Sequence, residues 1–296
     1  MPALVATIVA DPARTRLSDA ELRRIAQAAS GYEGRTWLDE GVAADLFFTA
    51  DLPATRAALE ATLAEEPVDV IVQRAEGRAK RLLVADMDST LIGQECLDEL
   101  AAFAGVGEKV AAITERAMRG DIAFEPALRE RVGLLVGLPV TVIDAVLGER
   151  IALNPGARTL TRTMQKRGGR VAIVSGGFRQ FTTAILERIG ADEDRANTLE
   201  IDGDILTGRV VDPVLGRDAK LAALDEIAAA MGLSRSETMA VGDGANDLAM
   251  LQAAGLGVAY RAKPKVAAAA DARIDQADLT ALLFAQGVAR KDFVED

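Results

Sequence analysis

The sequence predicts an α/β protein in which a parallel sheet carries an inserted helical segment and follows a smaller α+β unit. Three short, mainly apolar runs (residues 82–85, 170–174 and 239–241) have the continuous hydrophobicity of strands buried on both faces. Each run is followed by a polar turn and then by a helical pattern, which is the order of strand–turn–helix units. A long helical stretch separates the first run from the second, which indicates an insertion.

The amino-acid composition excludes several kinds of catalytic and binding site. The chain has 296 residues, half of them hydrophobic, a length that favours two domains or one domain with an insertion. Its net charge of −11 argues against electrostatic binding of nucleic acid or of an anionic membrane. The chain has no histidine, which excludes histidine bases and histidine-ligated zinc, and Cys96 is the single cysteine. We expect Cys96 to be a small buried side chain and keep it only as a minor candidate.

The first residues lack the basic stretch of a signal peptide and reach Asp11 early. The longest apolar stretch, residues 133–148, contains Pro139 and Asp144 and is too short to span a bilayer. We therefore expect a cytoplasmic protein without a membrane segment.

Residues 1–76 are predicted to form a separate unit. Strand patterns over residues 4–9, 36–38, 43–49 and 68–72 alternate with two helices, one capped by Ser18 and one opened by Pro53. The order β-α-β-β-α-β is that of a ferredoxin-like sandwich, and in pattern it resembles the amino-acid-binding ACT family. The charged residues 73–81 are interpreted as a linker.

Two carboxylates, Asp86 and Asp88, follow the first buried strand. Ligands of open α/β sheets bind at the carboxyl ends of strands. Acids one residue apart repel each other unless a cation or a shared proton compensates. One interpretation is phosphoryl transfer through an aspartyl-phosphate with a magnesium ion; the other is an acidic turn that caps the next helix. This stretch by itself favours neither.

Residues 93–148 are predicted to be helical, with helices over 95–104, 108–119, 125–136 and 140–147. In the third helix Arg131 lies on the same face as an apolar stripe made by Leu128, Val132 and Leu135. A guanidinium on an inward face needs a carboxylate or phosphate partner, unless its stem extends to solvent. Glu95, at the start of the segment, is on its own a surface charge.

Polar residues also follow the other two strands. Ser175 and Gly176 precede a helix, so they form either an anion site or an ordinary glycine-rich turn. Lys220 lies in the first turn of a helix that begins near Asp218, where it opposes the helix dipole; it is either paired with an anion or solvated. After the third strand come Asp243, Asn246 and Asp247, which offer the hard oxygen ligands that magnesium prefers. A hairpin is predicted over residues 198–211.

The motifs D-M-D-S-T, S-G-G and G-D-G-A-N-D, with Lys220 between the last two, together resemble those of the haloacid dehalogenase superfamily over residues 80–296. Glu95, Met118, Phe124 and Arg131 make the helical segment similar to that of the phosphoserine phosphatases in this superfamily. The resemblance implies a Rossmann-like core over residues 77–92 and 149–296 with a helical cap over 93–148. Residues 1–76 would then be an ACT-like regulatory domain.

The resemblance also implies the chemistry. Asp86 would be the nucleophile and Asp88 the acid and base. Magnesium would be held by Asp86, the main-chain carbonyl of Asp88 and Asp243, with Asp247 one step further out.

It further implies how a substrate would be held. Ser175, Gly176 and Lys220 would bind the phosphoryl oxygens, and Asn246 would orient the lysine or the phosphate. Glu95 would face the ammonium group of phosphoserine, and Arg131 its carboxylate. Met118 and Phe124 would line the pocket.

The expected reaction is hydrolysis of O-phospho-L-serine, the last step of serine biosynthesis, by a chain that could form a homodimer. Two alternatives remain. One is a phosphatase or phosphotransferase of the same superfamily that acts on another small phosphomonoester such as phosphohomoserine. The other is a phospho-acceptor or amino-acid-sensing regulator without turnover.

Overall fold

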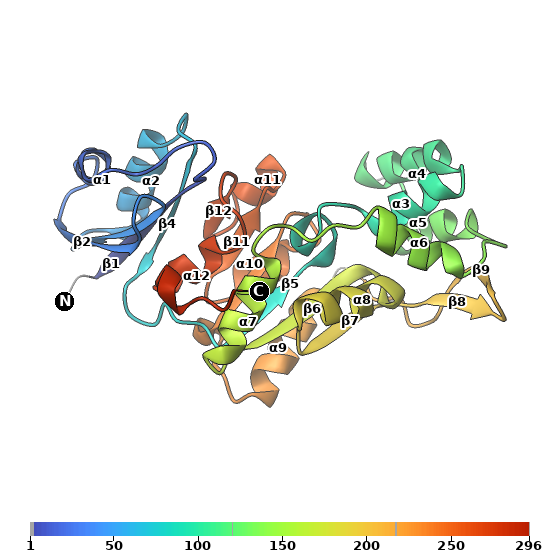
Figure 1. Cartoon of the computed structure of the whole chain (residues 1–296). Helices are drawn as coiled ribbons and strands as arrows, with labels where there is room; N and C mark the ends of the chain where they lie inside the picture. Colours follow the sequence, from blue (N-terminus) through green and yellow to red (C-terminus); the bar gives the residue numbers. More distant parts are fainter. Residues whose placement is uncertain (1–2, 120, 217, 296) are drawn as a thin grey trace.

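A computed structural model describes residues 3–119, 121–216 and 218–295, and the side chain of Met118 is outside the described residues. The chain forms a four-stranded antiparallel sheet, a six-stranded parallel sheet and a two-stranded hairpin. Figure 1 shows the antiparallel sheet at one end of the molecule, the parallel sheet in the middle and a group of helices at the other end.

The N-terminal sheet has the order β2-β3-β1-β4, and two helices cover one of its faces. Its elements are β1 (Leu4–Ala10), α1 (Asp19–Ala26), β2 (Tyr32–Asp39), β3 (Ala43–Phe48), α2 (Leu52–Thr62) and β4 (Val68–Arg74). Ser18 caps α1, since its side chain accepts from the Glu21 amide while the Glu21 carboxylate accepts from the Ser18 amide. The predicted order of strands and helices is confirmed. Strand β4 extends to Arg74, so the first residues of the stretch interpreted as a linker are strand.

The other face of this sheet packs against the rest of the chain. Val9, Ala43 and Ile71 belong to the same hydrophobic cluster as the parallel sheet. The buried carboxylate of Asp69 accepts from the backbone amides of residues 275–277 at 2.7 to 3.2 Å. The two sheets are therefore joined by apolar contact and by a buried acceptor.

The parallel sheet has the order β12-β11-β10-β5-β6-β7. Its strands are β5 (Leu82–Ala85), β6 (Arg170–Phe178), β7 (Glu193–Asn197), β10 (Thr238–Gly242), β11 (Gly257–Tyr260) and β12 (Ala272–Ile274). Helices cover both faces: α7 (Ala157–Lys166), α8 (Arg179–Ile189) and α12 (Ala281–Ala285) one face, and α9 (Ala219–Ala230), α10 (Leu248–Ala253) and α11 (Pro264–Ala267) the other. Alternate residues of β5 contact the two layers, which explains its continuous apolar run.

This strand order places the three motif-bearing strands side by side. Strand β5 pairs with β10 on one edge and with β6 on the other, always in parallel. Because the carboxyl ends of parallel strands meet at the same edge of a sheet, the three polar turns converge there.

The inserted segment folds into α3 (Cys96–Phe103), α4 (Gly107–Arg119), α5 (Phe124–Gly133) and α6 (Thr141–Glu149). Two connections join it to the core and pair with each other: Ile92 and Leu153 form an antiparallel bridge. The side-chain amide of Asn154 adds hydrogen bonds to the carbonyls of Thr90 and Ile92 at 2.8 and 3.1 Å. We call α3 to α6 the cap.

A hairpin of β8 (Leu199–Asp202) and β9 (Ile205–Val210) reaches the cap from the core side (Figure 1). Leu206 exchanges backbone hydrogen bonds with Gly137 and Leu138 at 2.9 and 2.8 Å, and Val140 donates to Asp204 at 2.8 Å. The hairpin therefore supports the cap at its far end.

Some predicted boundaries are wrong. The third cap helix ends at Gly133 instead of residue 136, because residues 137–139 pair with β9. The Ser175–Gly177 segment lies within β6, and the following helix begins at Arg179. Residues 262–270, whose sequence favours a helix, form only the short helix Pro264–Ala267. Strand β7 was not predicted, since its sequence, E-D-R-A-N, has no apolar run. Within the described residues no helix is both long and apolar enough to cross a membrane.

Candidate active site

Asp86 and Asp88 lie in a tight turn directly after β5. Ser89 in this turn adopts left-handed backbone angles (φ 54°), which are strained for a residue other than glycine and are often found at functional sites. The side chains of Asp86 and Asp88 accept hydrogen bonds from different parts of the chain. Asp86 accepts from the Met87 amide at 2.8 Å, whereas Asp88 accepts from the Cys96 amide, at the start of α3, at 3.0 Å. Asp88 thus accepts from the first amide of α3, whose N-cap position is Glu95, so the helix-capping interpretation holds only in part.

Lys220 connects two acidic turns. Its ammonium nitrogen lies 2.6 Å from Asp86 Oδ2 and 2.6 Å from Asp247 Oδ1, and all three side chains are buried. Burial by itself lowers the pKa of Lys220, but the charges of Asp86 and Asp247 outweigh it and raise the pKa above its ordinary value. The alternative of a solvated lysine is therefore wrong, and the anionic partners expected of a lysine in a first turn are these two carboxylates.

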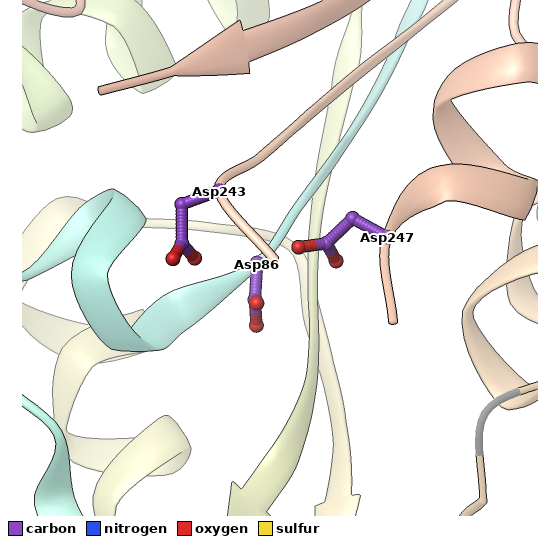
Figure 2. Close-up of side chains that lie close together, drawn as sticks. All are labelled: Asp86, Asp243 and Asp247. Atoms are coloured by element: carbon purple, nitrogen blue, oxygen red, sulfur yellow. The ribbon is translucent and has the colours of Figure 1, made fainter. Parts of the chain in front are cut away.

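The side chains of Asp86, Asp243 and Asp247 lie close together (Figure 2), with one oxygen of each carboxylate within 4.8 Å of the others. Burial, followed by the charge of Asp247, raises the pKa of Asp86 well above its ordinary value and that of Asp243 to about 6. Lys220 only partly offsets this repulsion at Asp86. Clustered hard oxygen ligands with uncompensated negative charge fit a divalent cation.

The resemblance places Asp247 one step outside the metal ligands, but its carboxylate belongs to this cluster. Both of its oxygens already accept hydrogen bonds. Oδ1 accepts from Lys220, and Oδ2 accepts from the Gly244 amide at 2.9 Å. The carboxylate of Asp88 is not part of the cluster, so only its main chain could serve the same ion.

Asp88 faces the cap and β6. Burial, followed by the charge of Glu95, raises its pKa to about 6, and the hydrogen bond from Cys96 offsets part of the shift. Ser175 Oγ lies 3.5 Å from Asp88 Oδ2. A carboxyl group with a pKa near neutrality can both give and take a proton, which is the requirement for general acid–base catalysis.

The Ser175–Gly177 segment closes the third side of the site. Ser175 Oγ accepts from the Gly177 amide at 2.9 Å. A Cβ on Gly177 would lie 2.8 Å from Asp88 Oδ2, so a side chain there would displace the acid. This requirement of Gly177 was not predicted; its only signal in the sequence is the second glycine of S-G-G.

The cap contributes Phe124 and Arg131 to a cavity of about 250 Å³ above the two aspartates. This cavity is lined by Asp86, Asp88, Glu95, Leu97, Phe124, Leu128, Arg131, Ser175, Gly176, Gly177, Phe178 and Asn246. A second cavity of about 400 Å³ shares Phe124, Arg131, Ser175, Gly176 and Asn246 with it and reaches Lys220, Leu215 and Gly216. The side chain of Phe124 lies against Gly176, where a Cβ would be 3.4 Å from its Cζ.

Arg131 has the inward position that the helical pattern predicted. Its guanidinium makes long contacts with Ala127 O (3.3 Å) and Thr114 Oγ1 (3.4 Å). It forms no ion pair within 4.0 Å in the described part of the chain. Burial lowers its pKa, and the charges of Asp98 and Glu95 only partly restore it. The group therefore has capacity for an anionic ligand.

The predicted site residues with described side chains all meet in this region. Glu95 accepts from Ser89 Oγ at 2.7 Å and lines the smaller cavity. Met118 falls outside the described side chains. Cys96 is buried, as expected, and burial together with the charge of Asp88 raises its pKa, so the thiol stays protonated.

Comparison with known proteins gives the family. The model of the haloacid dehalogenase-like hydrolases matches residues 83–252. A phosphoserine phosphatase of Streptomyces coelicolor is 47% identical over 239 residues, which are 80% of this chain and 58% of that protein. One of Streptococcus thermophilus is 46% identical over 200 residues, 68% of this chain and 93% of that protein.

Among solved structures, a HAD family hydrolase from Salmonella enterica serovar Typhi superposes with a TM-score of 0.86 at 28% identity. The match covers 95% of this chain and 97% of that one. The chain spans only 57 to 63% of the length of the first three curated relatives it matches.

Proposed function

Because this chain belongs to the haloacid dehalogenase-like hydrolase family, we propose that it hydrolyses O-phospho-L-serine to L-serine and phosphate in a magnesium-dependent reaction. The curated relatives that match it carry the name phosphoserine phosphatase. The observation that supports this substrate best is Arg131, a partly buried guanidinium that has no ion pair with any described carboxylate and that lines the smaller cavity together with Asp86 and Asp88.

Asp86 is the proposed nucleophile. Its two oxygens are held by the Met87 amide and by Lys220, which fixes the carboxylate at the end of β5. One oxygen attacks phosphorus, the bond from phosphorus to the serine oxygen breaks, and an aspartyl-phosphate forms. Asp88, protonated in this step, gives its proton to the leaving serine oxygen.

In the second step, hydrolysis of the aspartyl-phosphate, Asp88 acts as a general base. As a carboxylate it takes a proton from water, the water oxygen attacks phosphorus, and the acyl phosphate bond breaks to restore Asp86. Its pKa of about 6 lets it serve both steps near neutral pH. Its proximity to Asp86 also argues against a stable phospho-acceptor, which must keep its aspartyl-phosphate.

The remaining polar groups would hold the substrate. Ser175 Oγ, the Gly176 amide and Lys220 would donate to the phosphoryl oxygens, with Asn246 beside them. Glu95 would face the ammonium group and Arg131 the carboxylate, with Phe124 and Met118 of the cap helping to exclude water.

Asp86, Asp243 and the main-chain carbonyl of Asp88 would hold magnesium, with Asp247 beside them. The ion, when bound, would offset the negative charge of the carboxylates and polarise the phosphoryl group.

Phosphate release from a panel of phosphomonoesters, with and without magnesium, tests the activity. The panel should contain phosphoserine, phosphohomoserine and p-nitrophenyl phosphate. Asp86→Asn should abolish release from each of them, because an amide is not a nucleophile here. Turnover that survives this substitution, or full turnover in chelator, would refute the mechanism.

The substrate is tested by Arg131→Ala. Loss of a charge-assisted pair should raise KM for phosphoserine at least about tenfold, while p-nitrophenyl phosphate, which has no carboxylate, should change by less than about threefold. Arg129→Ala is the matched control, since Arg129 lies on the same helix but pairs with Glu125 and Asp212 at the surface. Equal losses on both esters would contradict the assignment of Arg131.

We further propose that residues 1–76 act as an ACT-like regulatory unit of the phosphatase formed by residues 77–296. Its packing against the core through Asp69 and Ile71 supports a coupling between them. Sedimentation of the full chain tests the predicted homodimer, and serine titration by calorimetry tests binding to this unit.

A further inference from the structure

A buried amide outside the predicted motifs holds two walls of the substrate cavities together. Asn197 ends strand β7, and its side chain is 2% exposed. Its Nδ2 donates to Gly176 O at 2.9 Å, and its Oδ1 accepts from the Leu215 amide at 2.7 Å. Nδ2 also lies 3.5 Å from Leu215 O.

The contact with Gly176 occurs at an irregularity in the sheet. Val174 of β6 pairs with Arg195 of β7, but the next pair is Phe178 with Asn197. Between these two pairs β6 has three residues, Ser175–Gly177, whereas β7 has one. The Ser175–Gly177 segment therefore bulges out of the ladder. The bulge would leave the Gly176 carbonyl without a ladder partner, and the side chain of Asn197 supplies one.

This bulge places the groups that face Asp88. It directs Ser175 Oγ to a point 3.5 Å from Asp88 Oδ2 and brings the Gly177 backbone so close to the same oxygen that only glycine fits. On its other side Asn197 fixes Leu215, which with Gly216 lines the larger cavity beside Ser175 and Lys220. One side chain thus sets the distance between the Ser-Gly-Gly bulge and the segment that precedes Lys220.

We propose that Asn197 is a positioning residue, which through its hydrogen bonds to Gly176 and Leu215 shapes the cradle for the phosphoryl group. The inference deepens the proposed function and rests on it for the identity of the ligand. The geometric part, that Asn197 holds the bulge and the Leu215 segment in place, is independent of which ester is hydrolysed.

Asn197→Asp is the sharpest variant because it nearly keeps the shape. Its Oδ1 can still accept from Leu215, but an oxygen replaces Nδ2 and faces Gly176 O, so that attraction becomes repulsion. Asn197→Ala removes both contacts. The matched control is Thr182→Val: Thr182 is also buried and bonds Asp194 of the same strand at 2.5 Å, but it contacts neither the bulge nor Leu215.

Two readouts are needed. In steady-state kinetics, Asn197→Asp should raise KM and the inhibition constant of inorganic phosphate at least tenfold, while Thr182→Val should stay within twofold of the parent chain. In amide hydrogen exchange, peptides that contain residues 175–178 and 214–216 should exchange at least tenfold faster in both Asn197 variants, and not in Thr182→Val. Exchange and kinetics of all variants are measured below their unfolding temperatures. Thr182→Val then shows how much of the change comes from a general loss of stability.

The outcomes are distinct. Unchanged exchange in the bulge overturns the positioning role whether or not the chain is active. Faster exchange with unchanged KM and phosphate inhibition also overturns it, because the bulge would then not shape the cradle. If the parent chain releases phosphate from another ester but not from phosphoserine, the proposed substrate fails and that ester serves for the kinetics. If it hydrolyses no ester, the proposed function fails while exchange still decides the role of Asn197.

Discussion

Gly242 offers a direct test of how tightly the acidic cluster is built. It is the last residue of β10, and a Cβ at this position would lie 2.3 Å from Asp247 Cγ and 2.5 Å from Asp247 Oδ2. Ordinary van der Waals contact begins at about 3.4 Å, so Gly242→Ala must move the Asp247 carboxylate by roughly 1 Å. Asp247 is held by Lys220 at 2.6 Å and by the Gly244 amide at 2.9 Å, and a shift of that size breaks both hydrogen bonds.

The cost follows from these contacts. Loss of one charge-assisted hydrogen bond and one neutral bond, together with overpacking, should lower the free energy of unfolding by about 3 to 5 kcal/mol. Affinity for a divalent cation should fall about 10- to 100-fold, the usual effect of disturbing the groups that support a metal site.

Urea unfolding in chelator and calorimetric titration with magnesium measure the two effects. Gly148→Ala is the matched control, because Gly148 lies within helix α6 with open space around it, and alanine there should stabilise the chain by about 0.5 to 1 kcal/mol. A Gly242→Ala variant that stays within 1 kcal/mol of the parent chain and binds magnesium equally well would refute this reasoning.

Three further predictions concern single side chains. Asp69→Ala leaves the backbone amides of residues 275–277 without their buried acceptor and should lower the free energy of unfolding by about 3 kcal/mol. Asp51→Ala, which removes the exposed cap of α2, should cost about 1 kcal/mol in the same urea experiment, and equal costs would contradict the role of Asp69. The raised pKa of Lys220 means that its stabilisation is fully present below the ordinary lysine value of 10.5 and is lost as pH rises through the higher folded-state pKa. In chelator, the stability difference between the parent chain and Lys220→Met should therefore shrink above pH 10.5, and a constant difference would exclude this linkage. Cys96 should resist iodoacetamide in the folded chain and react only after unfolding, because it is 1% exposed and burial raises the pKa of its thiol; native-state alkylation seen by mass spectrometry would show that α3 opens.

The arrangement of the core was predictable because its signals are local. A continuous apolar run with a polar turn after it is enough to predict β5 and β10, and the carboxyl-end rule then brings Asp86 and Asp243 together. The position of Arg131 followed from helical periodicity for the same reason. These features depend on a few neighbouring residues.

Other features depend on contacts that are distant in sequence, and these were not predictable. The third cap helix stops at Gly133 because β9, about seventy residues later, pairs with the residues after it. Strand β7 has polar residues and is recognisable only by its pairing with β6. Lys220 gave an ambiguous signal for the same reason, since both of its partners lie far away in sequence, in the turns that follow β5 and β10.

The charges of the site explain why a cation belongs there. Five carboxylates gather at this edge of the sheet, from Asp86, Asp88, Glu95, Asp243 and Asp247, and among the described residues Lys220, Arg131 and Lys263 supply the opposing positive charge. The pKa values of Asp86, Asp88 and Asp243 are all raised, first by burial and then by a neighbouring carboxylate. Lys220 cannot remove this excess, because its charge is already shared between Asp86 and Asp247.

A phosphate ester would add further negative charge to the same space. An added positive charge would favour its entry, because protonation of Asp86, which would also relieve the repulsion, would disable the nucleophile. We therefore expect a divalent cation to bind where Asp86 is buried beside Asp243 and Asp247. Any substitution that removes one of the two neighbours should weaken the dependence on metal together with the affinity for it.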